Sequence, residues 1–224
     1  MIALFRKEIS IFFSSLIGYL IIGIFLIINS ILLWSDFSDV NILSYGYADM
    51  DIFFSTAPIF FLLFIPALSM RVFSEEYTSG TIEILISKPI SSLKIILAKF
   101  LAVFSLVLFT IFFTLIYVVT LYVLGESVGN LDLASIIGSF FGLILLCGLF
   151  SSISVYASSI SSNQIISFVF AILLCTLFYF GFDFLSEFVF FQNFDLIIQQ
   201  IGISFHYEMI SKGLIKLSDV IYFL

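Results

Sequence analysis

One polar segment, residues 71–94, holds most of the side chains in this chain that could serve a function. It contains an acidic pair, Glu75 and Glu76, a glycine at position 80, and Thr81 and Glu83 directly after that glycine. Carboxylates and hydroxyl groups at this spacing are hydrogen-bonding groups suited to a protein partner. The segment therefore predicts binding, not catalysis.

The remaining candidates for chemistry are few. The only histidine, His206, lies near Glu208, but one histidine with scattered carboxylates does not make a metal site, and no metal is expected. The chain has no phosphate-binding G-x-x-x-x-G-K-[ST] motif and no plausible Ser/His/Asp set. Cys147 and Cys175 lie in long apolar stretches and are expected to be packing residues. We therefore expect a non-catalytic protein that binds no cofactor directly.

The local sequence of the polar segment predicts a short helix between two turns. Gly80 is expected to end the preceding helix, Thr81 to cap the new one, and Pro89 to stop it. Its apolar residues fall on one face at helical spacing: Ile82, Leu85 and Ile86. Such an amphipathic helix either lies in the lipid headgroups or binds a protein. Because anionic lipid favours Lys and Arg, the acidic residues here favour a protein partner.

The composition requires a membrane environment for the elements that position this segment. Of the 224 residues, 62% are hydrophobic and 10% are charged, and the mean hydropathy is +1.28. A soluble domain carries about 25% charged residues, so this chain cannot cover a surface that faces water. Its net charge of −7 argues against nucleic acid as a partner.

Intervals without charge locate the membrane spans, because ionisable groups are costly in hydrocarbon. The 50 residues between Asp132 and Asp183 make two spans, since one helix needs only about 20 residues to cross. We predict an all-α polytopic transmembrane helical bundle in a single domain, residues 1–224. The five predicted spans are about 11–33, 53–70, 100–124, 133–156 and 165–182.

The end of the chain predicts a further crossing. Residues 214–224 read as the start of a sixth span, which the sequence does not complete, and we expect a truncated chain. The first apolar block is too long for a signal peptide and lacks a small-x-small cleavage site, so we expect an uncleaved first span.

Basic residues predict the orientation. Six of the eight lie before the first span or between the second and third, a distribution typical of cytoplasmic segments. The other connections carry acidic residues, with Lys212 and Lys216 only in the last stretch. We expect the N-terminus and the 71–94 segment on the cytoplasmic side.

No predicted span has an ionisable residue near its centre. Ion-coupled carriers place such residues at mid-membrane depth, so an external energy source is expected for any transport. Two alternatives stay open. A secondary transporter would need a hidden polar site, for which Asn29 and Thr114 are the only candidates, and a scaffold without transport activity fits the same spans.

Three motifs resemble the ABC-2 type permeases, the membrane subunits of ATP-binding-cassette exporters. The first resembles their cytoplasmic motif and reads Arg71…Glu75-Glu76…Gly80-Thr81-Ile82-Glu83-Ile84-Leu85…Pro89-Ile90…Lys99. Residues 4–9 are similar to the short connecting helix before the family's first span, and residues 206–223 to the entry of its sixth. Among these permeases, the chain looks most like the gliding-motility-associated subunits.

The resemblance implies an exporter permease driven by a separate ATPase subunit, which docks on a coupling helix between the second and third spans. ATP and Mg would bind in that partner, not in this chain. A second permease subunit, identical or different, and membrane lipids are the other implied partners, and a multi-pass location in the inner (plasma) membrane is implied. Expected contacts with the ATPase are Glu75, Glu76, Gly80, Thr81, Glu83, Leu85 and Pro89, with Arg6 and Lys7 as a membrane-surface anchor.

Overall fold

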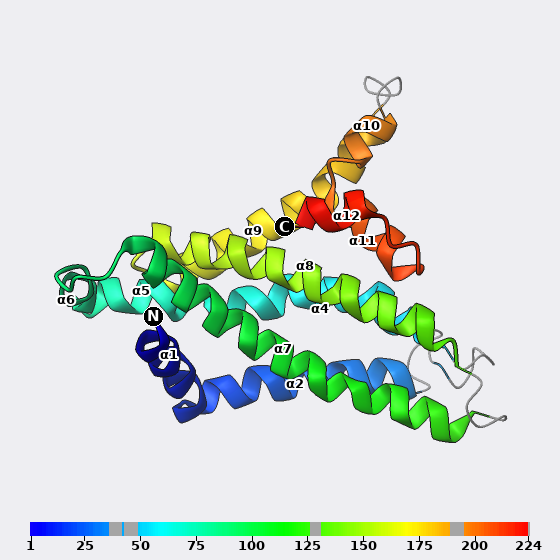
Figure 1. Cartoon of the computed structure of the whole chain (residues 1–224), viewed down its shortest axis with the longest axis horizontal. Helices are drawn as coiled ribbons and strands as arrows, with labels where there is room; N and C mark the ends of the chain where they lie inside the picture. Colours follow the sequence, from blue (N-terminus) through cyan, green and yellow to red (C-terminus); the bar gives the residue numbers. More distant parts are fainter. Residues whose placement is uncertain (36–41, 43–48, 126–130, 189–194, 224) are drawn as a thin grey trace.

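The computed structural model describes residues 1–35, 42, 49–125, 131–188 and 195–223. Every regular element in these residues is an α-helix (Figure 1), which confirms the predicted all-α class. Three residues of the predicted acidic connections, Asp36, Asp39 and Glu126, lie outside the described residues.

Five helices in the described residues are long and apolar enough to cross a membrane, which confirms the predicted number. They are α2 (Leu16–Trp34), α4 (Asp51–Ser69) continued by α5 (Arg71–Thr78), α7 (Ser92–Leu124), α8 (Leu133–Ile160) and α9 (Gln164–Ser186). In Figure 1 they form an elongated bundle, with α6 (Thr81–Ile86) at one end. We refer to the two ends as the α6 end and the opposite end.

The first span begins later than predicted. Residues 11–14 complete a separate helix, α1 (Ile2–Ser14), which meets α2 at a sharp bend (Figure 1). Ser15 makes this bend because its backbone is extended, with φ −99° and ψ 135°. Its hydroxyl accepts a hydrogen bond from the backbone N–H of Gly18 at 3.4 Å and so caps α2. The helix predicted before the first span is therefore present as α1.

The third span begins earlier than predicted, at Ser92 instead of residue 100. The prediction used the charge of Lys99 as a boundary, but the helix continues through it. With 33 residues, α7 is about 50 Å long, well above the roughly 30 Å of a hydrocarbon core. Its first two turns lie beside α6 at the α6 end of the bundle (Figure 1).

The centre of the bundle is α4, which contacts α2, α7, α8 and α9. Its fully buried residues recur every three or four positions, at Phe53, Ala57, Phe61, Ile65 and Leu68. This is the spacing of one helical face, and other residues of α4 are also buried because helices surround it. The helix is interrupted at Met70, four residues after Pro66, and α5 follows.

Small residues on α8 allow other elements to approach it closely. Ser158 is fully buried and donates its hydroxyl to the carbonyl oxygen of Met70 at 3.1 Å. The same hydroxyl accepts a hydrogen bond from the backbone N–H of Phe73. It therefore fixes the junction of α4 and α5 against α8.

The C-terminal part forms three short helices, α10 (Asp195–Gln199), α11 (Ile203–Ser211) and α12 (Leu217–Phe223). α11 packs against α8 and α9, and α12 packs against α8 and α11. The hydroxyl of Tyr207 donates to the carbonyl oxygen of Phe54 at 2.6 Å, which joins α11 to the core helix α4. The segment predicted to start a sixth span, 214–224, contains α12.

We predict that Gly142→Ala destabilises the contact between α8 and α11. A Cβ at position 142 would lie 2.7 Å from Cγ2 and 3.2 Å from Cβ of Ile210, which is fully buried and has no room to move. The expected loss of unfolding free energy is about 1–3 kcal/mol, measured by thermal unfolding in detergent.

Gly148→Ala is the matched control on the same helix. Its Cβ would meet Phe104 at 3.6 Å, an ordinary contact, so its stability should stay level or rise slightly with alanine's helix propensity. Equal melting temperatures for the two variants would refute the prediction.

Candidate functional site

The candidate site is the α5–α6 segment, residues 71–89, together with the helices that hold it. α5 continues the direction of α4 and ends at Thr78, as expected. Gly80 then takes a left-handed conformation with φ +70°, which reverses the chain into α6. No atom lies within 4 Å of a Cβ built at this position, so the backbone angle alone calls for glycine.

The start of α6 differs by one residue from the prediction. Gly80 is the N-cap residue and Thr81 is the first residue of the helix, with no side-chain capping bond. The hydroxyl of Thr81 instead lies 2.9 Å from that of Ser79. Because α6 has only six residues and buries none of them, its stability depends on the elements at its two ends.

Most of the predicted contact residues are exposed on this segment. They are Glu75, Gly80, Thr81, Glu83 and Pro89, and Leu85 is partly buried. The segment thus presents the carboxylates of Glu75 and Glu83 and the hydroxyl of Thr81 to the outside, and α6 packs Leu85 toward the core. This arrangement can bind a protein surface.

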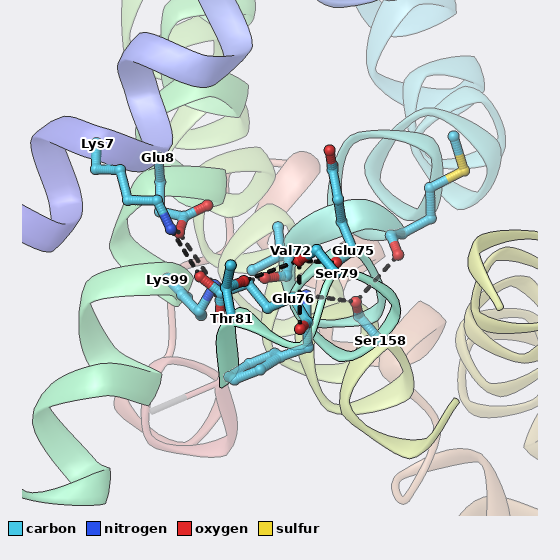
Figure 2. A network of polar contacts seen from close by, with 11 residues as sticks. Lys7, Glu8, Val72, Glu75, Glu76, Ser79, Thr81, Lys99 and Ser158 are labelled. Carbon is cyan, nitrogen blue, oxygen red and sulfur yellow. Dashed lines mark hydrogen bonds and ion pairs between the residues drawn. The ribbon is translucent and has the colours of Figure 1, made fainter. Parts of the chain in front are cut away.

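Glu76 differs from the other predicted contact residues because its side chain points into the bundle and the residue is 7% exposed. Figure 2 shows it between Lys7 of α1 and Lys99 of α7. Its Oε1 accepts a hydrogen bond from Lys7 Nζ at 2.8 Å, and its Oε2 lies 2.9 Å from Lys99 Nζ. Glu76 therefore links α5 to both neighbouring helices.

Lys99 is at the centre of this arrangement and has no exposed surface. Its Nζ also donates to Glu8 Oε1 at 3.0 Å and to the carbonyl oxygen of Val72. The Phe73 ring lies below it, with its centroid 4.8 Å from Nζ, a distance that permits a cation–π contact. All of these groups are favourable for a buried ammonium ion.

We call Lys7, Glu8, Glu76 and Lys99 the ion cluster. Its two positive and two negative charges balance, which a buried set of charges requires. The cluster joins α1, α5 and α7 at the α6 end (Figure 2). A cavity of about 200 Å³ lies beside it, between α1 and α5, and its lining includes Glu75 and Thr81.

The two residues predicted as a membrane-surface anchor differ in their surroundings. Arg6 is exposed, whereas Lys7 belongs to the ion cluster with about half of its side chain exposed. Burial alone would lower the pKa of Lys7, but the hydrogen bond and charge of Glu76, with the charges of Glu8 and Glu75, raise that pKa above its usual value. Lys7 therefore stays positively charged at physiological pH.

Sequence reasoning missed Lys99 and Glu8 as members of the site, although a signal for Lys99 was present. At helical spacing, Lys99 shares a face with Ile95, Val103 and Leu106, all of which are buried. A lysine on the buried face of an amphipathic pattern requires a carboxylate partner. Glu8 shows no comparable pattern, because its position beside α7 depends on how α1 packs.

The polar residues considered for an ion-coupled site are satisfied locally. Asn29 and Thr114 are both buried, and each donates a hydrogen bond to a carbonyl oxygen of its own helix, Phe25 at 2.8 Å and Ile111 at 2.6 Å. In the described part of the chain, both side chains thus contribute to their own helices, which does not favour a coupling-ion site at these two residues.

At the opposite end, His206 pairs with Asp219 and not with Glu208. Its Nδ1 lies 2.8 Å from Asp219 Oδ1, and its Nε2 lies 2.8 Å from the carbonyl oxygen of Gln200. Glu208 instead pairs with Lys212 on the surface at 3.2 Å. The histidine thus joins α11 to α12 in a buried contact.

The comparisons with known proteins give one match. A family model described as ABC-2 family transporter protein matches residues 4–218, a range that includes the ion cluster and the start of α12. Neither the curated proteins nor the solved structures contain a match to the chain.

Proposed function

Because the chain belongs to the ABC-2 family of transporter proteins, we propose that it is an exporter permease driven by a separate ATPase subunit that binds the α5–α6 segment. Membership makes the chain a multi-pass membrane permease and implies an ATPase partner and a dimeric arrangement in general. The separate ATPase subunit, its binding site on this chain and the orientation are the proposed parts.

The exposed α6 at the end of a membrane-spanning helix is the observation that carries the proposal. α4 and α5 together run from Asp51 to Thr78, and α6 follows after one tight turn. A protein bound to α6 therefore acts on the end of the most buried span in the bundle. Movement at this surface reaches the core without passing through a flexible loop.

The ion cluster extends this effect to two more helices. Glu76 lies in the last turn of α5, and its contacts with Lys7 and Lys99 tie α5 to α1 and α7. A displacement of α5 must therefore move α1 and α7 or break a buried ion pair, which is costly. We assign Glu76 this internal role and keep Glu75, Gly80, Thr81, Glu83, Leu85 and Pro89 as the contact surface.

The energy source in this proposal is ATP, bound with Mg in the partner subunit. If the ATPase has a different affinity for two packings of the bundle, ATP binding shifts the population from one to the other. In a dimer of permease subunits, tilting of α4 and α7 would then open a path between them. The proposal places the α6 end in the cytoplasm of the cell, in accord with its basic residues, and the protein in the inner membrane. A role in gliding motility stays a prediction from the sequence resemblance.

Glu83→Lys should abolish recruitment of the ATPase. The substitution reverses the charge of an exposed residue in the first turn of α6 and touches no buried contact. We expect co-purification of the ATPase in mild detergent to fall at least tenfold, while the amount of permease in the membrane stays constant.

Glu187→Lys is the control, since it makes the same charge change on an exposed residue at the opposite end. It should leave the yield of the ATPase unchanged. Normal co-purification with the Glu83 variant would argue against α6 as the docking site. A scaffold role would instead follow if the ATPase binds but no cargo moves in liposomes.

A further inference from the structure

A large cavity lies at the opposite end of the bundle, far from the ion cluster. It has a volume of about 570 Å³ and is lined by residues of α4, α8, α9 and α11. This volume is in the range of sites that hold a molecule of drug size. The lining combines aromatic rings, hydroxyl groups and carboxylates, contributed mainly by Phe54, Tyr179, Tyr207, Ser135, Asp51 and Glu208. We call it the α9–α11 cavity.

Tyr179 gives this cavity a hydroxyl group that the protein does not use. The residue is 6% exposed, and its ring packs against that of Phe150, with the centroids 5.9 Å apart. Its hydroxyl has no hydrogen-bond partner among the described residues, whereas that of Tyr207 in the same lining donates to the carbonyl oxygen of Phe54. Because a buried polar group without a partner is costly, this hydroxyl points to a ligand in the cavity.

The carboxylates around the cavity differ in how far they are already paired. Glu208 is close enough for its charge to act on the free phenol group, but it pairs with Lys212, the single cation in the described lining, at 3.2 Å. Asp49 and Asp132 line a smaller adjoining space and accept backbone hydrogen bonds at the starts of α4 and α8. Asp51 has no ion pair and no side-chain hydrogen bond in the described part of the chain. The cavity therefore has an excess of negative charge, with Asp51 as its unpaired carboxylate.

We infer that the α9–α11 cavity binds an organic cation of drug size that also carries a hydrogen-bonding group such as a hydroxyl. The ammonium group of this ligand would pair with Asp51, and its hydroxyl with that of Tyr179. Its apolar body would lie against the rings of Phe54 and Tyr207, which are also favourable neighbours for a cation. A neutral ligand would leave Asp51 without a partner, and an anion would be repelled by the carboxylates.

The test measures the binding of propranolol, a protonated aromatic amine with a hydroxyl group, to the purified permease. Isothermal titration calorimetry in a neutral detergent gives the affinity. Asp51→Asn should weaken binding about tenfold, because one contact between opposite charges near the surface is lost. The neutral diol analogue, in which a hydroxyl group replaces the amine, should bind the unaltered protein about tenfold more weakly than propranolol for the same reason.

Tyr179→Phe removes only the free hydroxyl and should weaken binding about fivefold, the effect of one hydrogen bond. Its unfolding temperature should not fall, because that hydroxyl has no partner in the described residues. The controls are Glu187→Gln and Tyr122→Phe, which remove a carboxylate charge and a phenol hydroxyl from exposed residues outside the lining. Both controls should leave the affinity unchanged.

A further variant fills the cavity without altering charge. Ser55 is exposed and lines the cavity, so Ser55→Trp should abolish saturable binding. Ile59→Trp is the matched control, because Ile59 is exposed one turn further along α4 and lies outside the lining.

Three results would each overturn the inference. They are equal affinity for propranolol and the neutral diol, an unchanged affinity in Asp51→Asn, and a dissociation constant for propranolol above about 1 mM in the unaltered protein. None of these results depends on the proposed docking of the ATPase, which concerns the α6 end.

Discussion

Lys99→Met should be the most destabilising substitution at the α6 end, with a loss of about 3–5 kcal/mol of unfolding free energy. Methionine keeps the length of the side chain but removes its charge. Glu8 and Glu76 would then share only Lys7, which is half-exposed and nearer to Glu76. The remaining buried negative charge and the lost hydrogen bond to Val72 both favour unfolding.

Thermal unfolding in detergent, with sensitivity of the α5–α6 segment to protease, measures this effect. Lys94→Met is the matched control, because it makes the same change five residues earlier on an exposed position of α7. Adding Glu8→Gln and Glu76→Gln to Lys99→Met should restore part of the stability, since no uncompensated charge remains. If Lys99→Met unfolds at the temperature of Lys94→Met, the ion cluster does not hold the helices together.

His206→Leu should produce the second large loss, of a similar size, at the opposite end. Both nitrogens of His206 face acceptors, Asp219 Oδ1 and the carbonyl oxygen of Gln200. The ring therefore links Gln200, which precedes α11, to Asp219 in α12. Without the ring, the buried carboxyl group of Asp219, whose Oδ2 has no hydrogen bond in the described residues, would lose its 2.8 Å contact with His206.

Hydrogen exchange of residues 203–223 measures this local loss directly. Lys212→Gln is the control because it breaks the exposed pair with Glu208, which contributes at most about 1 kcal/mol. Replacing Asp219 by Leu together with His206→Leu should recover much of the protection, since both polar groups are then absent. Unchanged exchange in the single His206 variant would show that α12 is held by apolar packing alone.

The sequence was sufficient for the fold class and for the number of spans. Charged residues are costly in hydrocarbon, so a long apolar interval without charge indicates a membrane span. Helix boundaries were less certain where a charge is buried in protein. The charge of Lys99 set the predicted start of the third span. The helix α7 begins two turns earlier and continues through Lys99, because this lysine points into the bundle.

The site was predictable as a segment but not residue by residue. The position of α6 follows from Gly80 and Pro89, whose backbone preferences are local. The local sequence does not determine which of Glu75 and Glu76 is buried. Adjacent residues on a helix point about 100° apart, and the packing of the helix decides which one faces the bundle. The partners of Glu76 are 69 and 23 residues away in sequence, so only the tertiary structure reveals the cluster.

The length of α7 has a consequence for the surrounding bilayer. Since the charge of Lys99 is turned inward, the outward face of α7 is apolar from Ile96 to Leu124, which is roughly 43 Å of helix. This exceeds the hydrocarbon thickness by roughly 13 Å, a hydrophobic mismatch that a helix relieves by tilting or by thickening the membrane around it. The height of α6 above the headgroups should therefore depend on acyl-chain length. Membrane thickness should thus affect the function of this permease through the position of α6.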